Sequence, residues 1–250
     1  MGFISKVVKT IDNIKLGYAS AIILCAGNSA RYGSGSENKQ LAQVGGKGVA
    51  ERTISVFESC KNIKEIVLVV RKEDLQKYKE LIIANDFKKI RCIVVGGDTR
   101  QNSAFRGFRH ISEKAKYVVI HDGARCLVTE EIIDTVLKNA VEYSAASAAH
   151  KSVDTVKWVD EDGMVKRTLD RDFVWNVQTP QAFDAKIYKV SAYNARQKNI
   201  EATDDCMLLE KAGFKVKLVE TGKENIKITV KEDIDYAEYI ISKRGENKEK

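Results

Sequence analysis

A loop rich in glycine and serine follows the first apolar run of the chain, Ala21–Ala26. The loop reads Gly27-Asn28-Ser29-Ala30-Arg31-Tyr32-Gly33-Ser34-Gly35 and is followed by Asn38-Lys39. Its backbone N–H groups can hydrogen-bond phosphate oxygens, while Arg31 and Lys39 can neutralise their charge. It is neither a P-loop nor a dinucleotide fingerprint, because no Gly-Lys-Ser/Thr closes it and the third glycine of the fingerprint is absent. The loop predicts phosphate binding, and a glycine turn required by sterics alone is the alternative.

The segment after another apolar run, Ile90–Val95, contains two adjacent glycines. It reads Gly96-Gly97-Asp98-Thr99-Arg100-Gln101-Asn102-Ser103. The glycines allow a planar base to approach the backbone, and Asp98 and Ser103 can hydrogen-bond to the edge of that base. The alternative is a glycine turn in which Asp98 or Thr99 caps a helix. The residue types leave both interpretations open.

A third polar segment, His121-Asp122-Gly123-Ala124-Arg125, ends the apolar run Tyr117–His121. An aspartate at the end of a buried parallel strand is well placed to bind a metal that also binds phosphate, and Arg125 can hold an anion. The alternative is a structural ion pair between Asp122 and Arg125. We expect His121 to orient Asp122. Because ligands bind beyond the carboxyl ends of the strands in an open parallel sheet, these three segments are the first candidates for a site.

Four later polar segments lie in settings typical of turns and helix caps. They are Asp170-Arg171, Gln178-Thr179-Pro180-Gln181, Thr203-Asp204-Asp205 and Asn225-Ile226-Lys227-Ile228-Thr229. The sequence contains no G-x-S-x-G elbow, no H-E-x-x-H helix and no Cys–His pair at a suggestive spacing. Covalent catalysis and zinc chemistry therefore have little support.

Short apolar runs alternate with segments of helical period, which is the pattern of an α/β protein. Strands are predicted at Ala21–Ala26, Ile66–Val70, Ile90–Val95 and Tyr117–His121. Helices are predicted at Val49–Cys60, Glu73–Ala84, Gln101–Ile111 and Glu130–Tyr143. Thr203 is expected to cap a later helix that closes at Gly213, and residues 229–232 have the form of a capping box. We expect a mostly parallel sheet, with helices on both faces, that continues to about residue 243.

Residues 155–169 break this pattern. Thr155–Val159 and Met164–Leu169 alternate polar and apolar residues around Asp160-Glu161-Asp162-Gly163, which predicts an inserted β-hairpin. Two isolated strands are only marginally stable in water, so this arm, about residues 152–174, needs a surface to pack on. A second copy of the chain and the arm's own domain are the two candidates.

The composition excludes several classes of protein. The 250 residues are 44% hydrophobic, with 42 Lys+Arg against 35 Asp+Glu and a net charge of +7. Disorder is excluded by this apolar content, and no apolar run approaches the ~20 residues that span a bilayer. Five cysteines without a C-x-x-C pair predict neither disulfides nor zinc, and the start of the chain lacks the form of a secretory signal. We expect a cytoplasmic protein.

The motifs together resemble the 2-C-methyl-D-erythritol 4-phosphate cytidylyltransferase family over about residues 19–242. The similarity is carried by Ala26-Gly27 with Arg31, Tyr32 and Lys39-Gln40, by Gly96–Ser103, His121–Arg125, Asp170-Arg171 with Trp175, Gln178–Phe183, Thr203–Asp205 and Asn225–Thr229. Each motif alone is weak, but seven in the same order are specific. The resemblance implies one Rossmann-like nucleotidyltransferase domain at residues 19–243, with an N-terminal extension at 1–18 and a charged tail at 244–250. It also implies a homodimer with interlocking arms.

The resemblance further implies a role for individual residues. CTP would contact Cys25, Ala26, Gly27, Gly97, Asp98, Ser103 and Gly123. The catalytic cations around the triphosphate would be Arg31, Lys39 and Lys227. Methylerythritol phosphate would contact Asp122, Arg125, Thr179 and Thr203, with Thr155 and Arg171 reaching over from the partner's arm. Asp122 would also bind Mg²⁺, the implied cofactor.

This chemistry agrees with the absence of a nucleophile in the sequence. The phosphate oxygen of the acceptor is already an anion that can attack the α-phosphorus of CTP, so charge repulsion and alignment dominate the barrier. A sister enzyme that uses ribitol 5-phosphate is the first alternative, and its resemblance is weakest around the arm. A basic nucleic-acid-binding domain is the second, although the Lys and Arg residues form no contiguous stripe.

Overall fold

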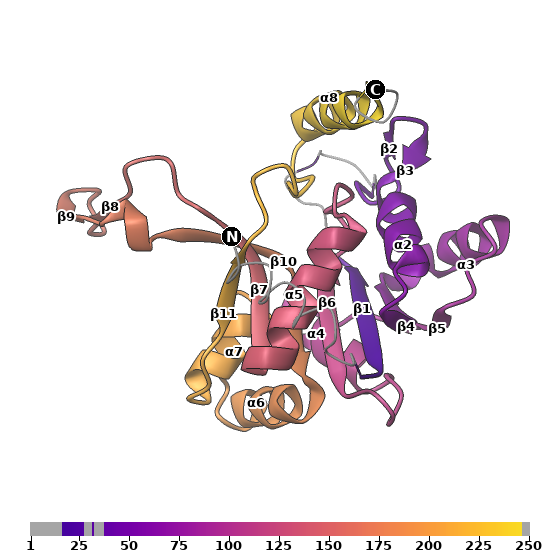
Figure 1. Ribbon diagram of the computed structural model, residues 1–250, viewed down its shortest axis with the longest axis horizontal. Helices are drawn as coiled ribbons and strands as arrows, with labels where there is room; N and C mark the ends of the chain where they lie inside the picture. Colours follow the sequence, from indigo (N-terminus) through magenta and orange to yellow (C-terminus); the bar gives the residue numbers. More distant parts are fainter. Residues whose placement is uncertain (1–16, 28–31, 33–37, 247–250) are drawn as a thin grey trace, which may run out of the picture.

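The computed structural model describes residues 17–27, 32 and 38–246 (Figure 1). Its central sheet has seven strands in the spatial order β11 (Lys217–Glu220), β7 (Ala145–Lys151), β10 (Trp175–Asp184), β6 (Tyr117–Asp122), β1 (Ala19–Cys25), β4 (Ile63–Val70) and β5 (Ile90–Val95). Only β10 is antiparallel to its neighbours, because it pairs with β6 and β7 in the opposite direction. The other neighbouring pairs are parallel. The predicted mostly parallel α/β fold is confirmed.

Helices cover both faces of the sheet. One face packs against α2 (Val49–Ser59), α3 (Leu75–Ala84) and α5 (Glu130–Tyr143). The other packs against α4 (Arg100–Phe108), α6 (Ala185–Gln197) and α7 (Asp205–Lys211). Within β1, Ala21, Ile23 and Cys25 belong to the first cluster, whereas Ile22 and Leu24 belong to the second. A central strand buried on both faces carries apolar residues on both, as β1 does from Ala21 onwards, which is why it is recognisable in the sequence.

The predicted elements exist, with ends that differ by a few residues. β5 and α5 have the predicted bounds, whereas α4 ends at Phe108 rather than Ile111, and Lys72–Asp74 form a 3-10 turn ahead of α3. The predicted cap at Thr203 is wrong, because Asp204 accepts the hydrogen bond from the backbone N of Met207.

Four further elements of the main sheet and its helical layers are not apparent in the sequence pattern: β7, β10, β11 and α6. Gln178–Gln181, expected in a turn or cap, lies in β10 instead. The sequence of β7, Ala-Ala-Ser-Ala-Ala-His-Lys, lacks the branched and aromatic residues that favour strands. Pairing with β10 and β11 stabilises this strand, so tertiary context decides its structure.

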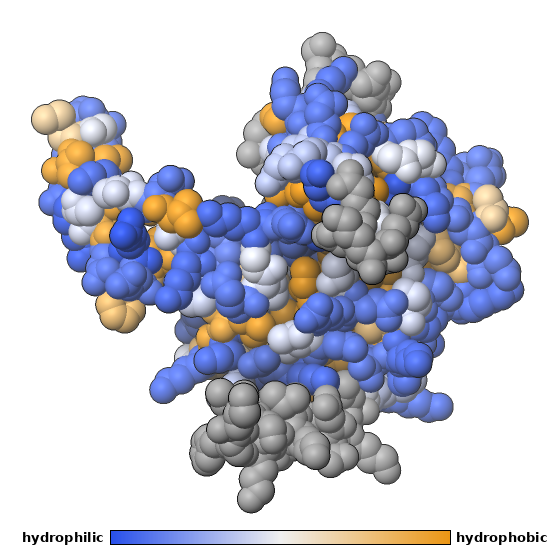
Figure 2. Space-filling model, turned by 45° about the horizontal axis from the view of Figure 1, so that its top comes forward, coloured by the Kyte–Doolittle hydropathy of each residue, from blue (hydrophilic) through white to orange (hydrophobic). Residues whose placement is uncertain are grey.

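The predicted hairpin is present and projects from the body of the molecule (Figure 1). β8 (Lys157–Val159) and β9 (Val165–Thr168) pair antiparallel in a sheet of their own, and every residue of both strands is exposed. The arm therefore does not pack on its own domain. Its surface carries apolar side chains among the polar ones (Figure 2), including Trp158, Met164, Val165 and Phe173.

A third apolar cluster lies beneath the last helix, α8 (Glu232–Glu246), next to the short hairpin β2 (Gln43–Val44) and β3 (Lys47–Gly48). α8 extends three residues past the expected boundary at 243. The capping box predicted at residues 229–232 is wrong, because the Asp233 carboxylate accepts hydrogen bonds from the backbone N–H groups of Thr229 and Val230.

None of the described helices has the length and hydropathy to span a membrane.

Candidate active site

Two cavities open at the carboxyl ends of the parallel strands. The first, of about 310 Å³, is lined by Leu24, Ala26, Gly27, Lys39, Gln40, Gly97, Asp98, Thr99, Arg100, Ser103, Asp122, Ala124 and Lys227. The second, of about 890 Å³, is lined by Arg100, Asp122, Arg125, Val177, Gln178, Thr179, Gln181, Thr203, Asp204, Cys206, Met207, Glu210, Phe214, Lys215, Val216, Leu218 and Lys227. Three charged residues, Arg100, Asp122 and Lys227, belong to both walls. The two cavities therefore meet at these side chains.

Most residues predicted to bind CTP line the first cavity: Ala26, Gly27, Gly97, Asp98 and Ser103. Cys25 and Gly123 lie behind its wall, packed against each other. A Cβ atom on Gly123 would collide with the Cys25 sulfur and would lie 2.7 Å from the amide oxygen of Gln40. Glycine is thus required at position 123 by close packing. Burial raises the pKa of the Cys25 thiol to about 12, so this side chain stays neutral.

Close packing accounts for the two adjacent glycines, Gly96 and Gly97. A Cβ on Gly96 would collide with the Cβ of Ala26, and a Cβ on Gly97 would lie 2.6 Å from the Cβ of Asn102. Both glycines therefore allow the segment after β5 to approach Ala26 and α4. The Ser103 hydroxyl is also bonded to the protein, because it accepts from the backbone N of Gly97 at 3.1 Å. Ser103 thus orders this turn, in agreement with the interpretation of the segment as a glycine turn.

Thr99, and not Asp98, caps α4. Its hydroxyl accepts a hydrogen bond of 3.0 Å from the backbone N of Asn102. Asp98 is exposed and lines the first cavity. The capping interpretation is therefore right for Thr99, while the Asp98 side chain does not accept that bond.

The carboxylate of Asp122 is the centre of the site. Its Oδ1 atom accepts from Arg100 Nε at 3.0 Å, and its Oδ2 atom accepts from Lys227 Nζ at 2.6 Å. Burial alone would raise the pKa of Asp122, but the charges of Arg100 and Lys227 outweigh this effect and hold the pKa well below its usual range. Asp122 is therefore an anion between two cations. Within the described part of the chain it pairs with these two residues and not with Arg125, so the proposed Asp122–Arg125 ion pair is wrong.

The backbone of Asp122 is held by a chain of buried polar groups. Its N–H donates to the Thr179 hydroxyl at 3.0 Å, and this hydroxyl lies 3.1 Å from His121 Nδ1. Since the hydroxyl has a single proton, we assign that proton to the bond with Nδ1 and the ring proton to Nε2, which lies 3.2 Å from the carbonyl of Arg125. Burial lowers the pKa of His121 to about 3, so the ring is neutral. His121 thus orients Asp122 through Thr179.

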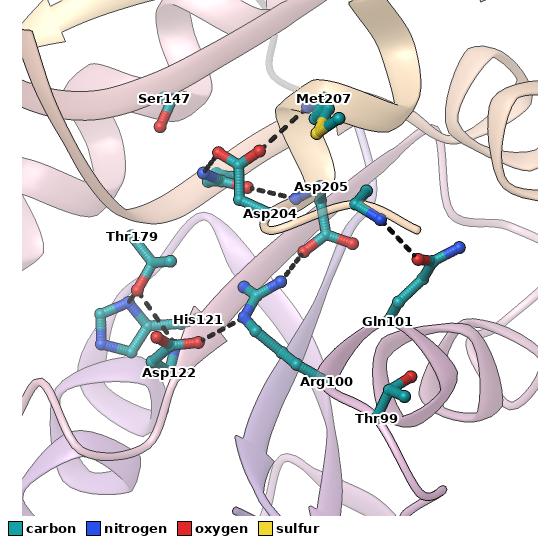
Figure 3. A network of polar contacts seen from close by, with 12 residues as sticks. Thr99, Arg100, Gln101, His121, Asp122, Ser147, Thr179, Asp204, Asp205 and Met207 are labelled. Atoms are coloured by element: carbon teal, nitrogen blue, oxygen red, sulfur yellow. Dashed lines mark hydrogen bonds and ion pairs between the residues drawn. The ribbon is translucent and has the colours of Figure 1, made fainter. Parts of the chain in front are cut away.

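Arg100 connects this carboxylate to a second one (Figure 3). Its Nη1 atom donates to Asp205 Oδ2 at 2.6 Å, and Asp205 also accepts from the Tyr188 hydroxyl at 2.9 Å. Burial by itself would lower the pKa of Arg100, but Asp205 and Asp122 together raise it above its ordinary value. Arg100 lies in the polar segment Gly96–Ser103, but its residue type and spacing predict no role for it. Its two acidic partners lie 22 and 105 residues further along the chain, so spacing could not reveal the bridge.

The predicted acceptor residues Arg125, Thr179 and Thr203 line the second cavity. Arg125 donates from Nη1 to the backbone oxygen of Asn225 at 2.7 Å, and its buried Nε has no partner within the described residues. Thr203 is exposed at the start of α7. Thr179 is buried, and its hydroxyl is occupied by His121 and Asp122. The Thr203 hydroxyl makes one weak contact, a donation to the Met207 sulfur at 3.9 Å. Of the three side chains, only that of Arg125 thus has a buried polar atom without a partner.

The two residues predicted on the arm are not brought to either cavity. Thr155 and Arg171 are exposed in the arm and line neither cavity. Arg31 lies outside the described residues. Across residues 17–27, 32 and 38–246, no three His, Cys, Asp or Glu side chains form a group that could hold a metal. Asp122 is thus a single carboxylate, without a preformed cage of acids.

Comparisons with known proteins agree with this geometry. Residues 19–243 match the profile of the 2-C-methyl-D-erythritol 4-phosphate cytidylyltransferase family. An enzyme of that name from Caldanaerobacter subterraneus is 39% identical over 90% of this chain and 99% of the relative, and one from Alkaliphilus oremlandii is 40% identical over 92% and 97%. The crystal structure of 4-diphosphocytidyl-2C-methyl-D-erythritol synthase from Anaerococcus prevotii matches with a TM-score of 0.82 at 35% identity, covering 92% of this chain and 98% of that one.

Proposed function

Because the chain belongs to the 2-C-methyl-D-erythritol 4-phosphate cytidylyltransferase family, a family of nucleotidyltransferases, we propose that it transfers CMP from CTP to 2-C-methyl-D-erythritol 4-phosphate. The products are 4-diphosphocytidyl-2-C-methyl-D-erythritol and pyrophosphate. The transfer would supply isoprenoid synthesis by the non-mevalonate route. As a cytidylyltransferase of small molecules it would act in the cytoplasm, a location that cell fractionation can test.

One observation carries the proposal: the two cavities share Arg100, Asp122 and Lys227. The first cavity would hold CTP, and the second would hold the acceptor phosphate. Attack on the α-phosphorus requires two anionic groups to come within bonding distance, and the shared wall is where the two ligands would meet. Cations at that wall lower the repulsion between them.

The catalytic work falls to the cations and not to a general base. The acceptor phosphate is already ionised, so no proton must be removed. His121, the histidine in the site, is neutral and its ring nitrogens face protein groups, in keeping with this requirement. Lys39 and Lys227 line the first cavity and would neutralise the triphosphate. Arg31 is assigned the same role from the family resemblance alone.

The residues present also fit a magnesium ion. Mg²⁺ in nucleotide sites takes one or two carboxylates, and substrate phosphates and water supply its other ligands. Asp122 provides one such carboxylate, held ionised at the shared wall. Bound to it, Mg²⁺ would neutralise phosphate charge and favour the departure of pyrophosphate.

The exposed arm supports a homodimer. Phe173 is 83% exposed and Met164 68% exposed, and the arm offers these side chains no apolar cover of its own. A second copy of the chain would cover them and would bring Thr155 and Arg171 to the second cavity of its partner. Each active site would then consist of residues from two chains, and dimerisation would be required for activity.

The test is pyrophosphate release from CTP and Mg²⁺, measured in parallel with methylerythritol phosphate and with ribitol 5-phosphate. We expect release with methylerythritol phosphate only. Release with the ribitol compound alone would keep the fold and the nucleotide site but overturn the acceptor. If neither acceptor leads to pyrophosphate release, the proposed function is overturned. A salt-dependent gel shift with duplex DNA would then test whether the basic surface binds nucleic acid.

A further inference from the structure

The turn that presents Lys39 to the nucleotide cavity is tied to the start of a distant helix. The backbone N of Leu41 donates to the oxygen of Asn38 at 2.8 Å, which closes a β-turn over Asn38–Leu41. Lys39 and Gln40 are its two central residues, and both line the first cavity. The direction in which they point therefore depends on how this turn is held.

Asn38 holds the turn from inside. Its Oδ1 atom accepts from the backbone N of Gln40 at 3.1 Å, so the side chain forms an Asx turn within the β-turn. Its Nδ2 atom donates to Asp74 Oδ2 at 2.7 Å. Both ends of the Asn38 amide are thus used, one by the turn and one by Asp74.

Asp74 occupies a position where aspartate usually caps a helix, yet it does not cap one. It is the N-cap residue of α3, but its side chain accepts no hydrogen bond from that helix. Asp74 is 2% exposed, and its Oδ2 atom accepts instead from Asn38 and from Arg71 Nε at 2.6 Å. The hydrogen bond to Asp74 raises the pKa of Arg71. Asp74 thus uses one oxygen atom both for a local ion pair with Arg71 and for a contact with Asn38, 36 residues away.

We propose that Asp74 is a positioning residue for the nucleotide: by holding Asn38, it sets the turn that directs Lys39 and Gln40 into the first cavity. This inference rests on the proposed function, because it assigns that cavity to CTP. Asp74 lines neither cavity and acts through Asn38. A substitution of Asp74 should therefore change the kinetic constants for CTP and not those for the acceptor.

A swap of the two side chains tests the contact. Asn38→Asp places a carboxylate against the Asp74 carboxylate, and the like charges repel. Adding Asp74→Asn restores a donor and an acceptor in reverse, and Asp at position 38 can still accept from the backbone N of Gln40. We expect Asn38→Asp to raise KM for CTP or lower kcat by about 10- to 100-fold, as for other small misplacements of a catalytic group. The double variant should recover most of this loss, and KM for methylerythritol phosphate should stay within about twofold throughout.

Glu65→Gln is the matched control. Glu65 is also a buried acid that contacts an arginine, Arg91, and it lies near the start of β4, whereas Asp74 follows the end of that strand. The control should lose stability without the specific effect on CTP. If Asn38→Asp does not fold, Asp74→Asn tests the same contact with a smaller expected rise in KM for CTP.

Hydrogen exchange separates this inference from the proposed function. Exchange of the amides of residues 40–42, measured by mass spectrometry without ligand, should accelerate in Asn38→Asp and return towards the wild-type rate in the swap. If the wild type transfers no CMP, the proposed function fails, and these rates still decide whether Asp74 holds the turn. Unchanged exchange, unchanged constants for CTP, or a swap as impaired as Asn38→Asp would each overturn the inference.

Discussion

The predicted functional groups are buried and paired in the body of the molecule but exposed in its arm. In the body, Asp122 contacts Arg100 and Lys227, and Asp205 fixes Arg100, so the site is ordered by residues of one chain. In the arm, Phe173 is exposed to solvent and Arg171 lines neither cavity. Buried polar groups need hydrogen-bond partners within the fold, whereas exposed apolar groups are available to pack against another chain. The body should thus be damaged by local substitutions, and the arm by loss of its partner.

The largest effect is expected from the cations of the body. Lys39→Ala or Lys227→Ala should slow CMP transfer by about 10²–10³-fold, because each removes a charge-assisted donor from the crowded phosphates. Steady-state kinetics of pyrophosphate release measures the loss. Lys64→Ala, at an exposed position near the start of β4, is the control and should retain full activity. A Lys39→Ala or Lys227→Ala variant with wild-type kinetics would remove that lysine from the mechanism.

Arg100→Gln should break the polar network next. The substitution leaves the buried Asp205 without a cation and leaves Asp122 with Lys227 alone. This loss costs about 3 kcal/mol in the free energy of unfolding. Denaturant titration by circular dichroism measures this cost. Activity should fall as well, since Asp122 loses its Oδ1 partner. A stability equal to that of the wild type would show that the bridge contributes no net stabilisation.

Phe173→Asp should weaken the dimer and leave the body intact. Loss of an interface anchor costs about 2 kcal/mol, which is roughly 30-fold in the Kd of the dimer. Sedimentation at several protein concentrations measures Kd, and activity per chain should fall on dilution. Ile83→Asp alters an equally exposed apolar side chain on α3 and should change neither quantity. A fully active Phe173→Asp monomer would contradict a site shared between chains.

Arg171→Ala should raise KM for methylerythritol phosphate by about 10-fold, the value of one hydrogen bond to a charged group. A mixture with Lys39→Ala sharpens the test. At equal amounts, half of the dimers are mixed, and each mixed dimer has one site with wild-type Lys39 and a wild-type Arg171 from its partner. About a quarter of the wild-type activity should therefore return at low acceptor concentration. Recovery no greater than the sum of the two separate variants would place Arg171 outside the partner's site.

The smallest effect is a loss of stability in mild acid. The pKa of His121 is lowered to about 3 by burial, against about 6.5 when unfolded. Below pH 6.5 the unfolded state binds a proton that the folded state does not, so stability is present above this pH and is lost as pH falls. The loss should be about 1 kcal/mol between pH 6.5 and 5.5. His121→Asn should be less stable at pH 7 but flatter over this range in denaturant titrations, and an equal slope would assign the acid sensitivity to other groups.

Local sequence pattern determined the elements that are buried on both faces and the polar segments that follow them. Ala21–Cys25 of β1 and Tyr117–Ile120 of β6 are continuous apolar runs, so these strands and the polar residues that follow them were recognisable. The hairpin of the arm was predicted from its alternating polar and apolar residues. For the same reason the family resemblance could be stated before the structure, since it depends on those ordered motifs.

Only the tertiary structure decided which of these residues touch. β7 and β10 are held by their pairing and not by propensity. Arg100 meets Asp205 across 105 residues, and Asp74 meets Asn38 across 36. Arg100 follows Asp98, which could have paired with it locally, and Asp74 could have capped α3. The sequence pattern does not distinguish these local contacts from the distant ones that the fold makes. A periodic pattern reports the environment of each residue along the chain, whereas partners are chosen by the packing of the whole fold.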